Sequence, residues 1–409
     1  MRILYLCHRI PYPPDKGEKI RAFHQLQAIA KRHEVDLFTL ADDPADLERG
    51  PAALRGICRH VTVAQINPRL ARLRSFPYLF TSTPLTITYF GSAELRDWIR
   101  HAVAGRSYDL VFVYCSAMAQ YLEPARGIPV VTDLVDVDSD KWAQYAAFAR
   151  FPMSAIYRRE ARAMREYERA VCERSSTVVV TTEREAQLLR EISPAASVHV
   201  MTNGVDTEYF KPFEVRRNGG APVIGFVGDM AYFPNQEAVT FFAHKVLPLI
   251  RTAAPEARFL IVGRNPGPAV RDLARIDGIE VTGFVPDVRP HLERMWVSVA
   301  PFSVAAGIQN KILEAMASGI PVVATPRAAQ GLTRDAAAAV QIADGPEQIA
   351  SRTVELLRDP QFAREKGLES RRRVAADYSW ERSLQALLRI LEGSFRADTA
   401  TAGLPPSVV

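Results

Sequence analysis

The chain has 409 residues, of which 48% are hydrophobic and 24% charged, a composition typical of a soluble protein long enough for two domains. Its net charge of +5 comes from 51 basic and 46 acidic residues, so it permits contact with anionic lipid or acidic ligands but does not indicate nucleic-acid binding. The first residues become polar too early for a signal peptide, and no window approaches the ~20 apolar residues that a membrane span needs. The four cysteines are isolated, which favours free thiols in a reducing compartment. We therefore expect a cytoplasmic protein, at most peripheral on the inner face of the plasma membrane.

The first elements predict a parallel sheet. Residues 2–7 form an apolar strand, and a loop stiffened by three prolines leads through Gly17 into an amphipathic helix near residues 18–33, followed by a strand at 35–40. A strand, a helix and a strand in this order form a βαβ unit with parallel strands. The loop lacks the Gly-x-Gly-x-x-Gly pattern and the second strand does not end in an acidic residue, so a nicotinamide-dinucleotide site is not expected.

A helix at residues 46–55 and a strand at 61–66 precede a segment, 69–101, that mixes arginines with aromatic residues. Basic and aromatic side chains together suit a membrane surface or an acceptor groove. The alternative, which we prefer, is a helical subdomain with aromatic residues in its core and arginines in solvent.

Four aspartates crowd the carboxyl end of the predicted strand at 128–134, which comes after another strand at 108–114. They are Asp133, Asp136, Asp138 and Asp140. Ligands bind at the carboxyl ends of parallel strands, where close carboxylates raise one another's pKa unless a cation or a hydroxyl-rich ligand meets them. The alternatives are a hard-cation site or helix N-caps from Asp138 or Ser139. We favour capping together with ligand contact over a metal site.

A linker separates the first series of strands and helices from a second βαβ series. A long helix at 152–174 alternates arginines with glutamates, which is typical of a solvated face, and the strand at 198–202 ends in the turn Asn203-Gly204. Residues 211–222 have linker composition, and residues 397–409 suggest a disordered tail. The second series comprises strands at 223–228, 258–262, 279–282 and 297–301, helices near 235–250, 288–296 and 346–358, and a last helix beginning at Trp380.

The stretch 297–325 is predicted as strand, loop, helix, turn and strand. Gly307 allows a sharp turn, residues 309–317 favour helix, and Ser318-Gly319 ends that helix before a buried strand at 320–324. A loop from a parallel strand into a helix presents unpaired N–H groups and the positive end of the helix dipole, which favours an anion.

Lys311 and Glu314 share one face of that helix, three residues apart. Lys311 could meet phosphate oxygens while Glu314, roughly 4–5 Å further along the axis, accepts from hydroxyls, the pattern of a diphosphate next to a ribose. The alternative is a solvent-exposed Lys–Glu pair on an ordinary helix. The spacing alone does not decide between the two.

Motifs along nearly the whole chain resemble those of the GT-B glycosyltransferases, and of glycosyltransferase family four, the retaining group, in particular. The resemblance is carried by segments that occur in the same order as in that family. They are Asn203–Asp206, Gly225–Gly228, Phe259–Gly263, Val281–Phe284 and Asn310–Thr325. The Pro11–Gly17 and Val135–Trp142 segments are similar to those of sugar transferases associated with exosortase (PEP-CTERM) exopolysaccharide systems.

This resemblance implies an α/β fold of two doubly wound Rossmann-like domains with parallel sheets facing a central cleft. An acceptor-side domain at 1–210, completed by the helix 380–396, would precede a nucleotide-sugar-binding domain at 223–379. The implied reaction moves a sugar from a UDP- or GDP-sugar to a glycan or lipid-linked glycan, with no metal and no other cofactor. Lys311 would neutralise the leaving diphosphate, and Asp133 or Asp136 would position the acceptor hydroxyl.

The implied donor site comprises loop glycines, an arginine and the start of the helix at 309–317. These residues are Gly17, Gly228, Gly263, Arg264, Gly307, Ile308, Gln309, Asn310, Lys311 and Glu314. The chain departs from the family in two ways: Ala306 stands where the first Glu of Glu-x7-Glu is expected, and residues 228–235 lack the usual diphosphate-binding Arg and Lys. The open alternatives are therefore an NDP-sugar epimerase or hydrolase of the same fold, or a scaffold that binds nucleotide or glycan without catalysis.

Overall fold

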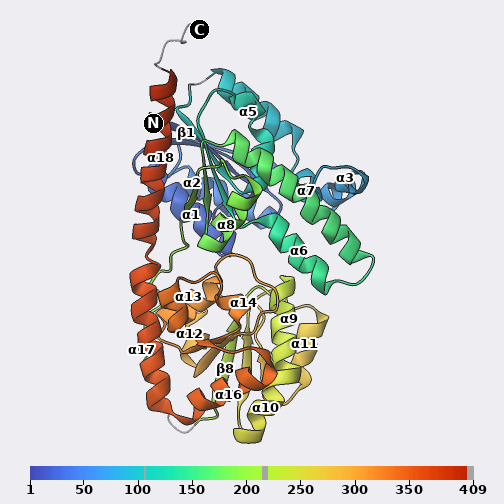
Figure 1. Ribbon diagram of the computed structural model, residues 1–409, viewed down its shortest axis with the longest axis vertical. Coiled ribbons are helices and arrows are strands. Elements are labelled where there is room, and N and C mark those ends of the chain that lie inside the picture. Colours follow the sequence, from blue (N-terminus) through green and yellow to red (C-terminus); the bar gives the residue numbers. More distant parts are fainter. Residues whose placement is uncertain (106, 214–219, 403–409) are drawn as a thin grey trace. The chain divides into compact units, whose positions relative to one another are not determined.

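The computed structural model describes residues 1–105, 107–213 and 220–402, without the side chains of residues 397–402. The chain divides into two compact units (Figure 1). The first unit comprises Met1–Thr202 together with Glu381–Val409, and the second comprises Asn203–Trp380. The second unit begins at Asn203 rather than after residue 210 because this segment is bound to its other end, where the Val205 N–H donates to the Tyr378 carbonyl at 2.9 Å. Residues 214–219 of the expected linker lie outside the described part of the chain.

A 7-stranded parallel sheet, in the order β3-β2-β1-β4-β5-β6-β7, forms the centre of the first unit. Its inner strands are almost continuously apolar and buried on both faces, as strands covered by helices on each side must be (Figure 1). The strand order reverses between β1 and β4. The strands are β1 (Arg2–Cys7), β2 (Glu34–Ala41), β3 (His60–Gln65), β4 (Leu110–Tyr114), β5 (Val130–Val135), β6 (Thr177–Val180) and β7 (Val198–Val200).

The helices of the first unit connect these strands, and the last one returns from the C-terminal end of the chain. They are α1 (Gly17–Ala30), α2 (Pro44–Leu54), α3 (Pro68–Ser75), η1 (Phe76–Phe80), α4 (Leu85–Tyr89), α5 (Ala93–Gly105), η2 (Ser116–Tyr121), η3 (Glu123–Ala125), α6 (Asp138–Phe148), α7 (Met153–Arg174), α8 (Glu183–Ile192) and α18 (Trp380–Ala402). Residues 397–402, expected in a disordered tail, continue α18.

The second unit contains a 6-stranded parallel sheet in the order β10-β9-β8-β11-β12-β13, which reverses between β8 and β11. Its strands are β8 (Val223–Val227), β9 (Arg258–Val262), β10 (Ile279–Val281), β11 (Val297–Ala300), β12 (Val322–Ala324) and β13 (Gln341–Ile342). Its helices are α9 (Phe233–Phe241), η4 (Phe242–Val246), α10 (Leu247–Ala253), α11 (Pro268–Asp272), η5 (Leu273–Arg275), α12 (Arg289–Glu293), α13 (Asn310–Ala317), α14 (Pro326–Ala329), α15 (Arg334–Ala338), α16 (Gly345–Arg358) and α17 (Pro360–Asp377).

The segment 69–101 is helical, as preferred from the sequence, but its aromatic residues do not all enter a core. Phe90 is buried, whereas Phe76, Tyr78 and Phe80 of η1 are exposed. The backbone features expected of the 297–325 stretch are present, since Gly307 and Gly319 have positive φ angles of 57° and 70°.

Candidate active site

In the second unit, the neighbouring strands β8 and β11 bring Lys311 to the carboxyl edge of the sheet. This is the point where the strand order reverses, the usual ligand position in an open α/β sheet. The Lys311 ammonium donates to Oδ1 of Asn235 at 2.8 Å, and Asn235 stands at the start of α9, just beyond β8. The ammonium also lies 4.6 Å from the ring centroid of Phe302 and 5.2 Å from that of Phe226.

Lys311 is therefore held as a half-buried cation against two aromatic rings. Burial lowers its pKa from 10.5 to about 8, and nearby Glu314 opposes that shift only in part. Within the described residues its single hydrogen bond is to a neutral amide rather than to a carboxylate. A cation poised in this way gains from an arriving anion, because the anion supplies the counter-charge that the protein leaves out.

Glu314 is half-buried one turn further along α13, and burial raises its pKa above the ordinary value. Its carboxylate makes no hydrogen bond or ion pair with the described residues, and Lys311 is not within ion-pair distance of it. The alternative of an ordinary surface Lys–Glu pair is therefore wrong. An acceptor that is partly withdrawn from water and lacks a partner is well suited to receive hydroxyl groups.

The loop before α13 is shaped by close backbone contacts. A Cβ at Gly331 would lie 2.2 Å from the Gly307 carbonyl oxygen, so the loop packs directly against a neighbouring glycine. Gln309 is the N-cap residue of α13 but its side chain does not cap the helix, since it donates to the Ala306 carbonyl at 3.0 Å. The first turn contains no acidic residue, so the positive end of the helix dipole has no counter-charge from its own sequence.

Two side chains tie this loop and helix to the rest of the second unit. Asn310 Oδ1 accepts from Nδ2 of Asn203 at 3.0 Å, which links the Asn203–Asp206 turn to α13. Ser303 Oγ donates to Glu237 Oε2 at 2.6 Å, which brings one carboxylate of α9 against the loop. Ile308, in contrast, is buried in the hydrophobic core, so only its backbone is available to a ligand.

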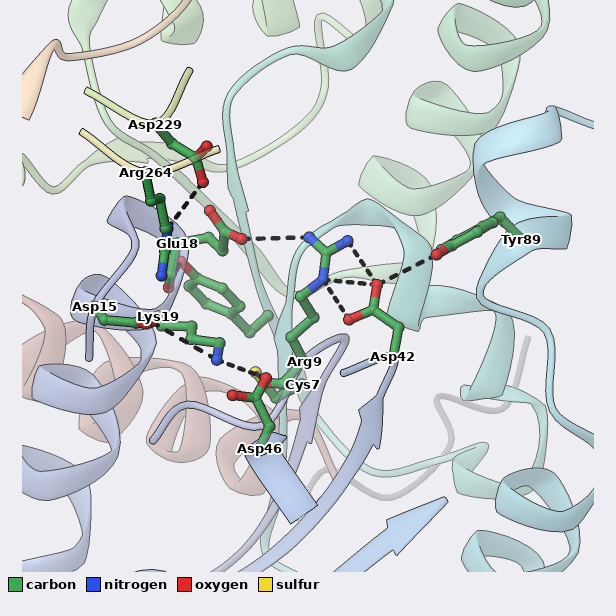
Figure 2. A network of polar contacts seen from close by, with 11 residues as sticks. Cys7, Arg9, Asp15, Glu18, Lys19, Asp42, Asp46, Tyr89, Asp229 and Arg264 are labelled. Atoms are coloured by element: carbon green, nitrogen blue, oxygen red, sulfur yellow. Dashed lines mark hydrogen bonds and ion pairs between the residues drawn. The ribbon is translucent and has the colours of Figure 1, made fainter. Parts of the chain in front are cut away.

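The ends of β8 and β9 meet through glycines. A Cβ at Gly263 would lie 1.7 Å from the Gly228 carbonyl oxygen, and the φ angle of Gly263 is +152°. Both the close contact and the backbone angle therefore exclude a side chain at this position. Arg264 Nε donates to Asp229 Oδ2 at 3.0 Å, a pair labelled in Figure 2. The charge of Arg264, expected to assist with phosphate, is therefore shared with an aspartate of its own unit.

In the first unit, the four aspartates at the carboxyl end of β5 and just beyond it do not form a common cluster. Asp133 is fully buried: its Oδ2 accepts from Arg21 Nε at 2.8 Å and from Gln25 Nε2 at 2.5 Å, and its Oδ1 accepts from the Val135 N–H at 2.9 Å. Because both oxygens are bound inside the core, the geometry of Asp133 points to a structural role. Its assignment as a catalytic residue stays a prediction.

The remaining aspartates have partners of their own. Asp136 is half-buried and accepts from Thr181 Oγ1 at 3.3 Å; burial raises its pKa, and the charge of Asp138 adds to this effect. Burial also acts to raise the pKa of Asp138, but Lys141 and the Ser116 hydroxyl outweigh it and hold that pKa below its usual range. Among the described residues no group of three or more His, Cys, Asp or Glu side chains is placed to hold a metal ion.

The amides at the start of α6 are capped from other helices. Glu185 of α8 accepts from the Val137 N–H at 2.6 Å, and Glu168 of α7 accepts from the Ser139 N–H at 3.0 Å and the Ser139 hydroxyl at 2.5 Å. Neither Asp138 nor Ser139 caps the helix, so that expectation is wrong.

The carboxyl edge of the first sheet carries a polar network that sequence reasoning missed (Figure 2). Arg9, just after β1, donates from Nη2 to Asp42 Oδ2 at 2.8 Å and from Nη1 to Glu18 Oε1 at 3.3 Å. The Tyr89 hydroxyl donates to the same Asp42 oxygen at 3.3 Å. Gly17, the expected donor contact in this unit, begins α1 one residue before Glu18. The edge can thus offer both donors and acceptors to a hydroxyl-rich molecule.

Two known families match the chain. Residues 19–209 match the family described as Glycosyltransferase Family 4, and residues 221–359 match Glycosyl transferases group 1. None of the curated proteins compared with the sequence is a significant match.

Solved structures of similar fold extend over nearly the whole chain. Sucrose-phosphate synthase from Thermosynechococcus elongatus has a TM-score of 0.71 at 18% identity, covering 97% of this chain and 100% of its own. Anabaena HepE in complex with UDP-glucose has a TM-score of 0.67 at 16% identity, covering 96% and 100%. A glycosyltransferase from Rickettsia africae has a TM-score of 0.63 at 13% identity, covering 96% and 98%. The predicted fold class, two doubly wound domains of the GT-B type, is confirmed.

Proposed function

Because this chain is a glycosyltransferase with the GT-B fold, built from a family-4 and a group-1 domain, we propose that it transfers a hexosyl group from a UDP- or GDP-sugar. The acceptor is a glycan or a lipid-linked glycan, and the configuration at the anomeric carbon is retained. The UDP and UDP-glucose named for the HepE structures support a nucleotide-sugar donor. The Pro11–Gly17 and Val135–Trp142 motifs support a role in exopolysaccharide biosynthesis, in the cytoplasm or on the inner face of the plasma membrane.

The observation that carries this proposal is the pairing of Lys311 and Glu314 on α13. The first is a half-buried cation bound only to an amide among the described residues, and the second a half-buried carboxylate without a partner there. A nucleoside diphosphate supplies what each lacks, since its phosphate oxygens meet Lys311 and its ribose hydroxyls donate to Glu314. The amides of residues 308–310 and the dipole of α13 add to phosphate binding.

The proposed chemistry needs no metal. As the bond from the sugar to the diphosphate breaks, negative charge grows on the leaving phosphate, and Lys311 with the N-terminus of α13 neutralises it. The departing phosphate accepts the proton of the acceptor hydroxyl. In the first unit, the half-buried Asp136 is our candidate for hydrogen bonding to acceptor hydroxyls. Glu237, held on the loop by Ser303, is our candidate for the sugar-reading carboxylate in place of Ala306.

The test is transfer from UDP- and GDP-hexoses, with and without a lipid-linked glycan acceptor, followed by NMR assignment of the new anomeric centre. Retained configuration in an acceptor-dependent product is expected. Free sugar or an epimerised donor without acceptor would instead indicate the hydrolase or epimerase, and donor binding without any product would indicate a scaffold.

A second measurement tests the ribose contact. We expect Glu314→Gln to weaken UDP binding by about tenfold to a hundredfold, the range of a charge-assisted hydrogen bond, while leaving pyrophosphate binding unchanged. The exposed Glu293→Gln change on α12 is the matched control. Equal UDP affinity in Glu314→Gln and the wild type would remove Glu314 from the site.

A further inference from the structure

One segment of the first unit turns its large apolar side chains toward solvent. In α3 and η1, residues 68–80, the exposed fractions are 50% for Leu70, 69% for Leu73, 65% for Phe76, 41% for Tyr78 and 82% for Phe80. The buried residues of α3 are the small Ala71 and Ser75. A helix that packs by its small residues and exposes its large ones has an apolar face that folding of the unit leaves uncovered.

The same segment is basic. Arg69, Arg72 and Arg74 are all exposed, and residues 68–80 contain no aspartate or glutamate. Within the described residues, these three guanidinium groups make no hydrogen bond or ion pair, although surface arginines elsewhere in the chain commonly do. The segment therefore combines an apolar surface with three unneutralised positive charges.

This surface is a firmly held part of the fold. Asn67 caps α3 by accepting from the Arg69 N–H at 3.0 Å. At the far end, Arg159 of α7 donates from Nη2 to the carbonyls of Tyr78 and Thr83, both at 2.6 Å, and to that of Thr81. The exposed rings thus stand on a backbone fixed at both ends, so little conformational freedom is lost when they become covered.

A second group of exposed apolar side chains lies at the tip formed by α6 and α7. Phe148, Phe151 and Met153, at the turn from α6 to α7, have exposed fractions of 51%, 84% and 41%, beside the exposed Arg150. Met153 is six residues from Arg159, or roughly 9 Å along α7, which links this tip to the segment that Arg159 holds.

We propose that α3 and η1, with the α6–α7 tip, form a docking surface for an anionic lipid bilayer. The aromatic rings and leucines enter the boundary between headgroups and acyl chains, and the arginines meet anionic headgroups. A second copy of the chain fits less well, because a twofold contact would set this basic segment against itself. The inference deepens the proposed function, since it rests on an acceptor that lies at a membrane.

The experiment is flotation of the full chain with vesicles of phosphatidylglycerol and phosphatidylcholine, compared with vesicles of phosphatidylcholine alone. Binding is expected to the anionic vesicles and to weaken as salt is raised. Replacing Arg69, Arg72 and Arg74 with Gln should lower the partition coefficient by roughly fivefold per arginine, the factor equivalent to about 1 kcal/mol each. Phe76→Ser with Phe80→Ser should lower it by at least tenfold.

Matched controls keep the test specific. The charge control removes three exposed arginines elsewhere by replacing Arg126, Arg364 and Arg372 with Gln. The apolar control, Phe284→Ser with Leu368→Ser, removes exposed apolar side chains of the second unit. Controls that lose vesicle binding as fully as the α3 and η1 variants, or a wild type that does not float, would overturn the proposal. So would a shift from monomer to dimer that the aromatic substitutions abolish, because it would identify a second copy as the occupant.

The vesicle assay contains no donor, so its failure is separate from failure of the proposed transferase activity. Transfer to a water-soluble glycan acceptor should be the same in the α3 and η1 variants as in the wild type. Loss of transfer to a lipid-linked acceptor alone, together with loss of flotation, would connect the two.

Discussion

Lys311 and Asn235 lie 76 positions apart in the sequence and are joined by a 2.8 Å hydrogen bond from the ammonium to Oδ1 of the amide. The amide group of Asn235 is itself fixed, because its Nδ2 donates to the Asp229 carbonyl at 2.8 Å. Gly228 provides the room: a Cβ there would lie 2.7 Å from Asn235 Nδ2. A buried amide thus sets the direction of the only side-chain cation in the first turn of α13.

Replacing Lys311 with Met should abolish tight nucleotide binding without unfolding the second unit. A charge-assisted hydrogen bond contributes about 1.5–3 kcal/mol, so UDP affinity should fall roughly tenfold to more than a hundredfold. The methionine fills a similar volume against the Phe226 and Phe302 rings, so the free energy of unfolding should not decrease. Titration calorimetry and urea unfolding measure the two quantities.

The exposed Lys245→Met change in the same unit is the control for loss of charge. Asn235→Ala is the companion variant. It should weaken UDP binding less than Lys311→Met does but cost about 1–3 kcal/mol of stability, because the half-buried Lys311 ammonium and the Asp229 carbonyl lose their hydrogen bonds to the amide. Unchanged UDP affinity in Lys311→Met would refute the donor site.

Donor binding should also depend on pH through Lys311. Since burial lowers the pKa of the free ammonium to about 8, the side chain loses its proton as the pH rises through that value. A bound diphosphate requires the charged form, so affinity for a UDP-sugar should be constant below about pH 7.5 and fall up to tenfold per pH unit above 8. A UDP-sugar is the suitable probe because its esterified diphosphate does not titrate in this range.

Stability should change in the opposite sense. The Lys311 side chain takes up its proton near pH 10.5 in the unfolded chain but near pH 8 in the folded chain, so this contribution to stability is lost as the pH falls through that window.

The control for the pH dependence of nucleotide affinity is Lys311→Arg. Because arginine stays charged, this variant should keep nucleotide affinity constant across the same range. A wild-type affinity that does not change between pH 7 and pH 10 would contradict the role given to Lys311.

The donor-site stretch could be predicted because its signals are local. Strand, glycine turn, helix and stop lie within residues 297–325, and both the φ angles and the helix agree with that pattern. The partners of the site are not local: no pattern in the sequence connects Lys311 with Asn235, or Asp133 with Arg21, 112 residues away. The residue types were visible, but only the fold determines which of them meet.

Helix α17 was missed for a different reason. Its buried residues are Ala363, Gly367, Ser370 and Val374, so its packed stripe is made of small residues and lacks the large apolar side chains by which an amphipathic helix is identified. The small residues are needed because the backbones meet closely: a Cβ at Gly367 would lie 2.0 Å from the Gly319 carbonyl oxygen. Close packing of the backbones thus removed the large apolar side chains from which the helix could have been predicted.

Substitution of Asp133 separates a structural role from a catalytic one. Asp133→Ala should destabilise the first unit by about 3–5 kcal/mol, because it leaves the fully buried Arg21 without its counter-charge. Arg21→Met combined with Asp133→Leu should recover much of that loss. Glu280→Gln, which breaks an exposed pair with Arg294, should cost less than about 1 kcal/mol in the same urea titration. A stable Asp133→Ala protein that lacks transfer activity would support the catalytic assignment.

Gly263 and Gly283 offer a matched test of how the ends of β8 and β9 are built. Both have positive φ angles, +152° and +71°, but a Cβ at Gly283 meets nothing within 4 Å, whereas one at Gly263 would lie 1.7 Å from the Gly228 carbonyl oxygen. Gly283→Ala should therefore cost only the strain of its backbone angle, about 1 kcal/mol. Gly263→Ala must also displace Gly228, which lies beside Asn235, so it should lose more than twice as much stability and weaken UDP binding as well. Equal unfolding free energies for the two variants would mean that the strand ends can separate, and Gly263 would then have no part in shaping the donor site.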